Sequence, residues 1–113
     1  MSNTVHEVIK LLSASFRKKF DDYIGMYLFG AYLDGLEHKD EDIELVALFG
    51  AEDKAKREAI WPIIGKIETD LNVSIDLYPY TEEEFKNDED LYDEVINEGI
   101  FYDSLGINKK TNK

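Results

Sequence analysis

Two acidic residues, Asp42 and Glu44, interrupt a stretch that otherwise predicts a buried strand over residues 43–49. A third acid, Asp76, lies in the middle of a second short apolar run. A carboxylate loses favourable hydration wherever it leaves water, so acids inside two strands need a reason. Residues two apart on a strand project from the same face. If the two strands are neighbours, the three carboxylates converge into a group of oxygen ligands that suits Mg²⁺ or Mn²⁺.

A turn at Gly30-Ala31 ends an almost continuously apolar run over residues 23–29. Backbone amides that point outward at such a turn bind phosphate oxygens without any side-chain charge. The same two residues also fit a simple tight turn. For the two acids of the first strand, the alternative is the solvated face of a half-exposed strand. For the third acid, it is a polar-face position or a salt-bridge partner.

Hydrophobic periodicity predicts the elements that must position these residues. An i, i+3, i+4 pattern indicates a helix, capped by Asn3 or Thr4, whose apolar face is Val5, Val8, Ile9, Leu12, Phe16 and Phe20. The other expected elements are strands at 23–29, 43–49 and 73–78, a helix at 53–71, helices opening at Thr81 or Asn87, and an extended piece at 100–102. Pro62 predicts a kink in its helix or a later start. This order predicts one α+β (α/β-like) domain over residues 1–107 and a polar, frayed tail at 108–113.

Composition excludes several kinds of protein. At 113 residues the chain has room for one domain with a real core. It has no cysteine, and therefore no disulfide framework, thiolate metal site or cysteine nucleophile. No signal peptide is recognisable, and the longest apolar run is about half of the roughly 20 residues that span a bilayer. We therefore expect a cytoplasmic protein with no membrane association.

The net charge of -12 is unevenly spread, with eight acids against one lysine in residues 81–94. Such a chain repels a bare polyanion, so direct nucleic-acid binding is not expected, whereas divalent cations are attracted. The run at 81–94 is either a solvated helical face or a docking surface for a basic partner. His6 and His38 have no partner at metal-ligand spacing and are expected on the surface. Trp61 is expected in the core or at its rim.

Three short motifs follow one another in a distinctive order. Phe29-Gly30-Ala31 comes first, and ten residues separate it from Asp42-Ile43-Glu44-Leu45. Ile75-Asp76-Leu77 comes third. With these motifs and the C-terminal stretch 92–105, the chain resembles the minimal nucleotidyltransferases of the DNA polymerase β superfamily. The resemblance covers most of the chain and implies their fold, a small mixed β-sheet with helices packed against it.

The resemblance also implies a reaction and a site. Asp42 and Glu44 would bridge two Mg²⁺ or Mn²⁺ ions, and Asp76 would hold the catalytic one and help to activate an acceptor hydroxyl. Gly30 and the amide of Ala31 would cradle the triphosphate of an NTP, with ATP the expected substrate. The hydroxyl would attack the α-phosphorus in line and release pyrophosphate. Small members of this family often act as antitoxins of HEPN-type toxins, which suggests a protein acceptor supplied by a partner.

Three positions depart from the family pattern. Ala31 stands where Ser or Gly is usual, which removes a hydroxyl group whose hydrogen bond is worth about 1 kcal/mol. Glu44 is one methylene longer than the commoner Asp, and Asp34 stands near a frequent Arg, with Lys39 the nearest basic residue. Two hypotheses therefore remain: an active metal-dependent nucleotidyltransferase, or a catalytically degenerate domain of the same fold that binds a partner. The sequence leaves the oligomeric state open.

Overall fold

Five strands form one mixed sheet in the computed structural model, which describes residues 4–36, 38, 40–51 and 53–109. Their order across the sheet is β3-β2-β1-β4-β5. The strands are β1 (Tyr23–Phe29), β2 (Ile43–Phe49), β3 (Ile75–Tyr80), β4 (Ile100–Asp103) and β5 (Asn108–Lys109). β2 and β3 are parallel, and the other neighbouring pairs are antiparallel. The small mixed sheet expected from the sequence is therefore confirmed.

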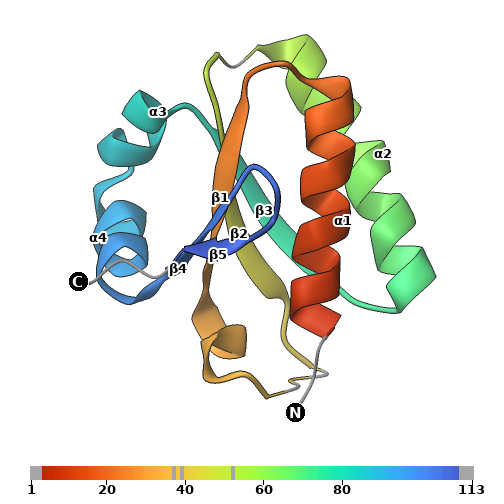
Figure 1. Ribbon diagram of the computed structural model, residues 1–113. Coiled ribbons are helices and arrows are strands. Elements are labelled where there is room, and N and C mark those ends of the chain that lie inside the picture. Colours follow the sequence, from red (N-terminus) through yellow and green to blue (C-terminus); the bar gives the residue numbers. More distant parts are fainter. Residues whose placement is uncertain (1–3, 37, 39, 52, 110–113) are drawn as a thin grey trace.

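Helices cover both faces of this sheet (Figure 1). The long helices α1 (Thr4–Lys19) and α2 (Lys54–Leu71) pack side by side on one face. The short helices α3 (Glu82–Asn87) and α4 (Glu89–Glu98) lie on the other. A single 3-10 turn, η1 (Gly30–Asp34), follows β1. No helix in the described part of the chain is long and apolar enough to cross a membrane.

Alternation along β2 divides the interior into two cores. Leu45, Ala47 and Phe49 belong to the larger core under α1 and α2. Val46 and Leu48 belong to the smaller core under α3 and α4. Because side chains alternate between the two faces of a strand, even-numbered β2 residues project toward α3 and α4. The candidate acids of the Asp-Ile-Glu motif share this even numbering.

α1 buries one face, as its periodicity predicts. Its buried residues are Val5, Val8, Ile9, Leu12, Ser13 and Phe16. Ser13 is the single polar residue among the described residues that is buried, and its hydroxyl lies 3.0 Å from the Tyr23 hydroxyl. That pairing satisfies a polar atom that would otherwise be costly to bury.

The boundaries of α2 agree with the expected helix. The Asp53 side chain accepts a hydrogen bond of 2.8 Å from the Lys56 amide and caps the first turn. The helix runs through Pro62 and ends at Asn72, which adopts a left-handed conformation with φ 55°. Proline within the expected helix thus does not delay its start.

Three local predictions need correction. The third strand runs from Ile75 to Tyr80 instead of 73–78, because each of its residues pairs with β2 from Ile43 to Leu48. It includes Pro79, which an edge strand tolerates. Thr81 opens α3 with a capping box, but α4 begins after Asp88 and not Asn87. Trp61 is 49% exposed, so it lies on the surface of α2 and not in the core.

The C-terminal hairpin extends the ordered chain into the expected tail. β5 pairs with β4 at Asn108 and Lys109, and residues 110–113 lie outside the described residues. Asp103 holds the turn, since its carboxylate accepts hydrogen bonds from two amides within the turn. The Arg17 guanidinium donates to the Ser104 carbonyl at 2.7 Å and ties the hairpin to α1.

A largely buried lysine connects α2 to the start of the sheet. The Lys56 ammonium donates to the Asp22 carboxylate at 2.5 Å and to the Ala51 carbonyl. It also lies 5.0 Å from the centre of the Phe49 ring, and its side chain is only 10% exposed. A charge with so little water around it depends on these partners.

Replacing Lys56 with Met should lower the free energy of unfolding by about 2 kcal/mol, because Asp22 loses its cation and the ring loses its charged neighbour. Lys66→Met is the matched control: Lys66 pairs with Asp70 at 3.1 Å but is 77% exposed. That change should cost less than about 1 kcal/mol. Urea unfolding measures the free energy of unfolding of both variants. Equal decreases would show that the buried pair stabilises the protein no more than the exposed pair.

Candidate functional site

The sheet places Glu44 and Asp76 next to each other. They are register partners on the parallel strands β2 and β3, so their side chains emerge side by side on one face. This is the face that carries α3 and α4. Asp42 is exposed and lies one residue before β2 begins, so alternation aims it to the same side. The structure therefore supplies the pairing of Glu44 with Asp76 that the expected convergence requires, and the shared metal site of the three acids stays a prediction.

The environment of Glu44 is strongly acidic. Burial raises the pKa of its carboxyl above the ordinary value, and the charges of Asp76, Glu94, Asp42 and Glu41 raise it further. Glu94 comes from α4, which contacts β1 over the same face. Sequence reasoning did not single out Glu94, because only the packing of α4 brings it near β2. Held together without a balancing cation, these acids repel one another.

Gly30 adjoins Glu44 so closely that no side chain fits. Its φ of 83° lies in the left-handed region, and an added Cβ would overlap the Glu44 Oε2 atom. The carboxylate therefore rests against the first residue of η1. The turn expected to bind phosphate and the acid expected to bind metal are in direct contact.

Asp34 and Ala31 are engaged within the η1 region. Asp34 accepts a hydrogen bond from the Leu36 amide at 2.8 Å and pairs with the His38 ring at 2.9 Å. The hydrogen bond from His38 lowers the pKa of Asp34, as does that from Leu36. Ala31 is half-buried and packs against the larger core. Lys39, expected to offset Asp34, lies outside the described residues.

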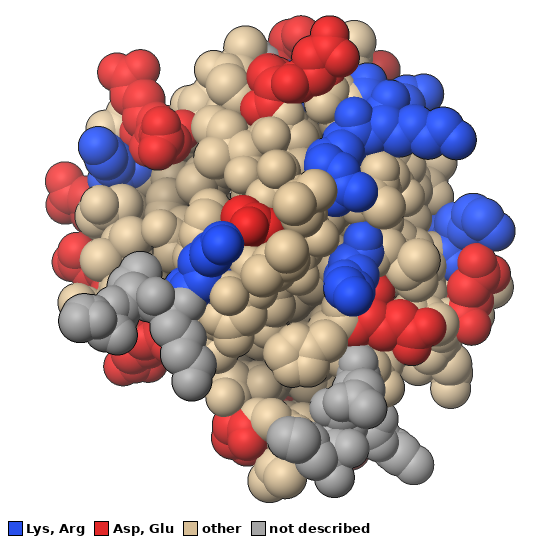
Figure 2. Space-filling model, viewed as in Figure 1, with Lys and Arg blue, Asp and Glu red and all other residues tan. Residues whose placement is uncertain are grey.

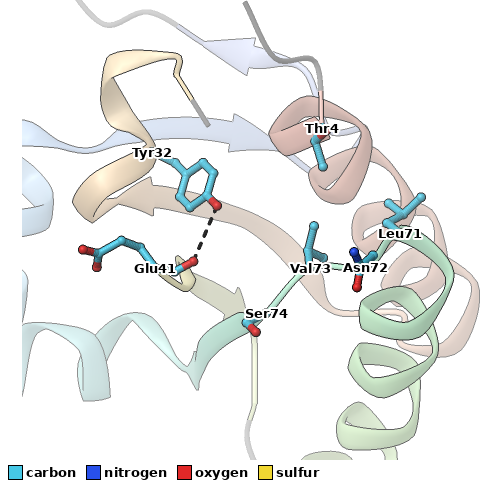
Figure 3. A pocket seen from close by; sticks show the side chains of 7 residues that line it. All are labelled: Thr4, Tyr32, Glu41, Leu71, Asn72, Val73 and Ser74. Atoms are coloured by element: carbon cyan, nitrogen blue, oxygen red, sulfur yellow. Dashed lines mark hydrogen bonds between the residues drawn. The ribbon is translucent and has the colours of Figure 1, made fainter. Parts of the chain in front are cut away.

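A hollow of about 400 Å³ is lined by none of Asp42, Glu44 and Asp76 (Figure 3). Its lining residues are Thr4, Tyr32, Glu41, Leu71, Asn72, Val73 and Ser74. The Glu41 carboxylate points away from the other lining side chains in Figure 3. The Tyr32 hydroxyl donates to the His38 carbonyl at 2.6 Å. Since none of the three candidate metal ligands lines the hollow, the candidate site lies on the sheet face and not here.

The candidate acids are the right type of ligand for a divalent cation, but their side chains are not grouped around one position. Carboxylate oxygens are the ligands that Mg²⁺ and Mn²⁺ prefer. Within the part of the chain that the structure describes, however, no three His, Cys, Asp or Glu side chains are grouped as metal ligands. The backbone provides the paired positions, and the side chains would have to reorient to share an ion.

Basic and acidic side chains are distributed unequally between the two sides of the sheet. Most Lys and Arg side chains seen in Figure 2 lie over the side of α1 and α2. α1 carries Arg17, Lys18 and Lys19 in its last turn, where they complement the helix dipole. α3 begins with Glu82, Glu83 and Glu84. The candidate site therefore lies on the acidic side of the sheet.

A sequence profile of the nucleotidyltransferase domain matches residues 9–102, which is most of the chain. The chain belongs to this family. Its motifs and its mixed sheet agree with that membership, and the resemblance drawn from the sequence is confirmed. No curated protein sequence matches the chain significantly.

Several solved structures share the fold. A toxin–antitoxin structure with AMP-PNP is 23% identical, with a TM-score of 0.60, and the match covers 88% of this chain and 71% of the other. A mutant of the MntA–HpeT toxin–antitoxin is also 23% identical, with a TM-score of 0.59 and coverage of 86% and 70%. A structure of a tri-AMPylated Shewanella oneidensis HEPN toxin in complex with MNT antitoxin gives a match of 22% identity, with a TM-score of 0.53 and coverage of 89% and 68%. At these identities the likeness concerns the fold.

Neutralising Glu44 should stabilise the protein. A carboxyl with a raised pKa in the folded state binds its proton more tightly there than in the unfolded state, so the folded state loses stability as pH rises through that pKa. Glu44→Gln should therefore raise Tm at pH 7 in EDTA, and the gain should vanish below the ordinary pKa of 4.5. Thermal unfolding across pH tests this. Glu58→Gln, on the exposed face of α2, is the control, and an equal gain there would contradict the assignment.

Gly30→Ala should lower the free energy of unfolding and displace the Glu44 side chain. The left-handed conformation costs a non-glycine residue on the order of 1–2 kcal/mol, and the new Cβ would displace the Glu44 carboxylate. Gly65→Ala is the matched control, because an added Cβ at this α2 position meets nothing within 4 Å. Alanine there should stabilise the helix by up to about 1 kcal/mol. Differential scanning calorimetry would contradict this account if both variants shifted Tm in the same direction.

Proposed function

We propose that this chain is a metal-dependent nucleotidyltransferase that transfers a nucleoside monophosphate from an NTP to a hydroxyl on a separate protein. The observation that carries the proposal is the register pairing of Glu44 with Asp76, beside Gly30, in a chain of the nucleotidyltransferase family.

The structural relatives support the nature of that partner. One is a complex containing an AMPylated HEPN toxin, and another contains AMP-PNP. We infer that the acceptor here is a hydroxyl of a HEPN-type protein and that ATP is the donor. Transfer would then inactivate the partner, so that this chain serves as its antitoxin.

The residues divide the chemistry among them. Asp42, Glu44 and Asp76 would hold Mg²⁺ or Mn²⁺, which when bound neutralises phosphate charge and favours in-line displacement. Gly30 and the Ala31 amide would orient the triphosphate. Asp76 would take the proton of the acceptor hydroxyl while the oxygen of that hydroxyl bonds to the α-phosphorus. The bond from the α-phosphorus to the bridging oxygen breaks, and pyrophosphate leaves with that oxygen.

A second candidate is a domain that keeps the fold and binds a partner without catalysis. Its support is specific: the described acids are not grouped as metal ligands, and Asp34 is paired with His38 where the family often has Arg. In this case the acidic face over α3 and α4 would contact a basic protein surface. Nucleotide binding distinguishes the two candidates.

Nucleotide with metal should raise Tm by several degrees. A ligand at about 100 times its Kd stabilises the native state by about 2.7 kcal/mol. Thermal unfolding with each of the four common NTPs, in Mg²⁺, Mn²⁺ and EDTA, measures the effect. The shift should require metal and should disappear in Asp42→Asn. Asp40→Asn, an exposed acid in the same loop, should leave it unchanged.

Two outcomes would argue against catalysis. An absence of any metal-dependent shift in the wild type would favour the partner-binding candidate. A shift that Asp42→Asn leaves intact would show that nucleotide binds elsewhere and would remove Asp42 from the site.

A further inference from the structure

A nucleotide at the proposed site would meet few hydrogen-bond donors. Ala31 has no hydroxyl, and the groups that act most strongly on Glu44 are other carboxylates. Asp34 is held by His38 and Leu36. A triphosphate needs donors as well as metal ions, since an unpaired phosphate oxygen loses its hydration on binding. Tyr78 lies in a position to supply one.

Tyr78 shares the site's face of the sheet. It follows Asp76 by two residues on β3, so both side chains project to the same side. Its register partner is Val46, two residues beyond Glu44 on β2. Tyr78 is half-buried: its ring packs against the smaller core and lies 6.2 Å from the ring of Tyr80, and the rest of the side chain is open to a ligand.

The Tyr78 ring extends toward the phosphate-binding turn. Its centre lies 6.3 Å from that of Phe29, the residue just before Gly30. β3 and β1 are separated by β2, a distance of roughly 10 Å across the sheet. The two rings therefore close much of that distance over β2, beside Glu44. This brings Tyr78 to the boundary between the acids and η1.

The Tyr78 hydroxyl is uncommitted among the described residues. Tyr27 and Tyr92 also form no hydrogen bond with a described residue, but their rings pack on Phe101 and Phe85, and neither lies on β3 beside Asp76. No described residue forms a hydrogen bond with the Tyr78 hydroxyl. A donor that faces a proposed phosphate site without an internal partner is available to a ligand.

We propose that the Tyr78 hydroxyl donates a hydrogen bond to a phosphate oxygen of the bound NTP. This inference rests on the proposed function and assigns a further residue to the same site. The adjacent strand thereby supplies the donor that the turn does not have.

The test compares two Tyr→Phe variants, each of which removes one hydroxyl group from the same face of the sheet. Tyr78→Phe should weaken binding of an ATP analogue blocked between the α- and β-phosphates about tenfold, measured by calorimetry in saturating Mg²⁺. Tyr27→Phe is the control, because its ring packs on Phe85 and Phe101, toward β4. Its affinity should stay within twofold of the wild type.

A further readout separates a direct contact from a structural effect. The analogue should also protect Tyr78, but not Tyr27, from nitration, as mapped by mass spectrometry.

The outcomes distinguish this inference from the proposed function. If the wild type binds the analogue, Asp42→Asn abolishes binding, and Tyr78→Phe binds like the wild type, the inference fails and the function stands. Nitration of Tyr78 that is unaffected by the analogue would also overturn it. If the wild type binds no NTP with Mg²⁺ or Mn²⁺, both fail.

Discussion

The parallel pairing of β2 with β3 is the constraint on which the rest of the structure depends. Parallel neighbours cannot be joined by a tight turn, so a crossover must connect them. α2 provides it, capped by Asp53 at its start and ended by the left-handed Asn72. The Ile43 amide then donates to the Ser74 carbonyl at 2.8 Å and starts the register. A slip of one residue would send Glu44 and Asp76 to opposite faces of the sheet.

That register holds like charges together at an energetic cost. Burial and the neighbouring acids both raise the pKa of Glu44, so its charged form is less stable here than in water. Such a cost is typical of sites whose function needs the charge. The protein offsets the strain elsewhere, with two apolar cores and the Lys56 contacts.

The η1 region shows how family departures are absorbed locally. Asp34, which stands where the family often has a cation, is occupied by His38 and the Leu36 amide. Gly30 keeps the conformation that lets Glu44 approach. The proposed role of Tyr78 extends the same pattern: a donor that the turn does not have comes from a neighbouring strand.

The sequence by itself determined the local features. Periodicity was sufficient for α1, β1, β2 and α2, because each has its own apolar pattern, and the motif order was sufficient for the family. Only the tertiary structure determined the features that depend on strand register and on packing between distant segments. It shifted the third strand to Ile75–Tyr80, exposed Trp61, and brought Glu94 to the acids. These depend on pairings between distant segments, which no local pattern encodes.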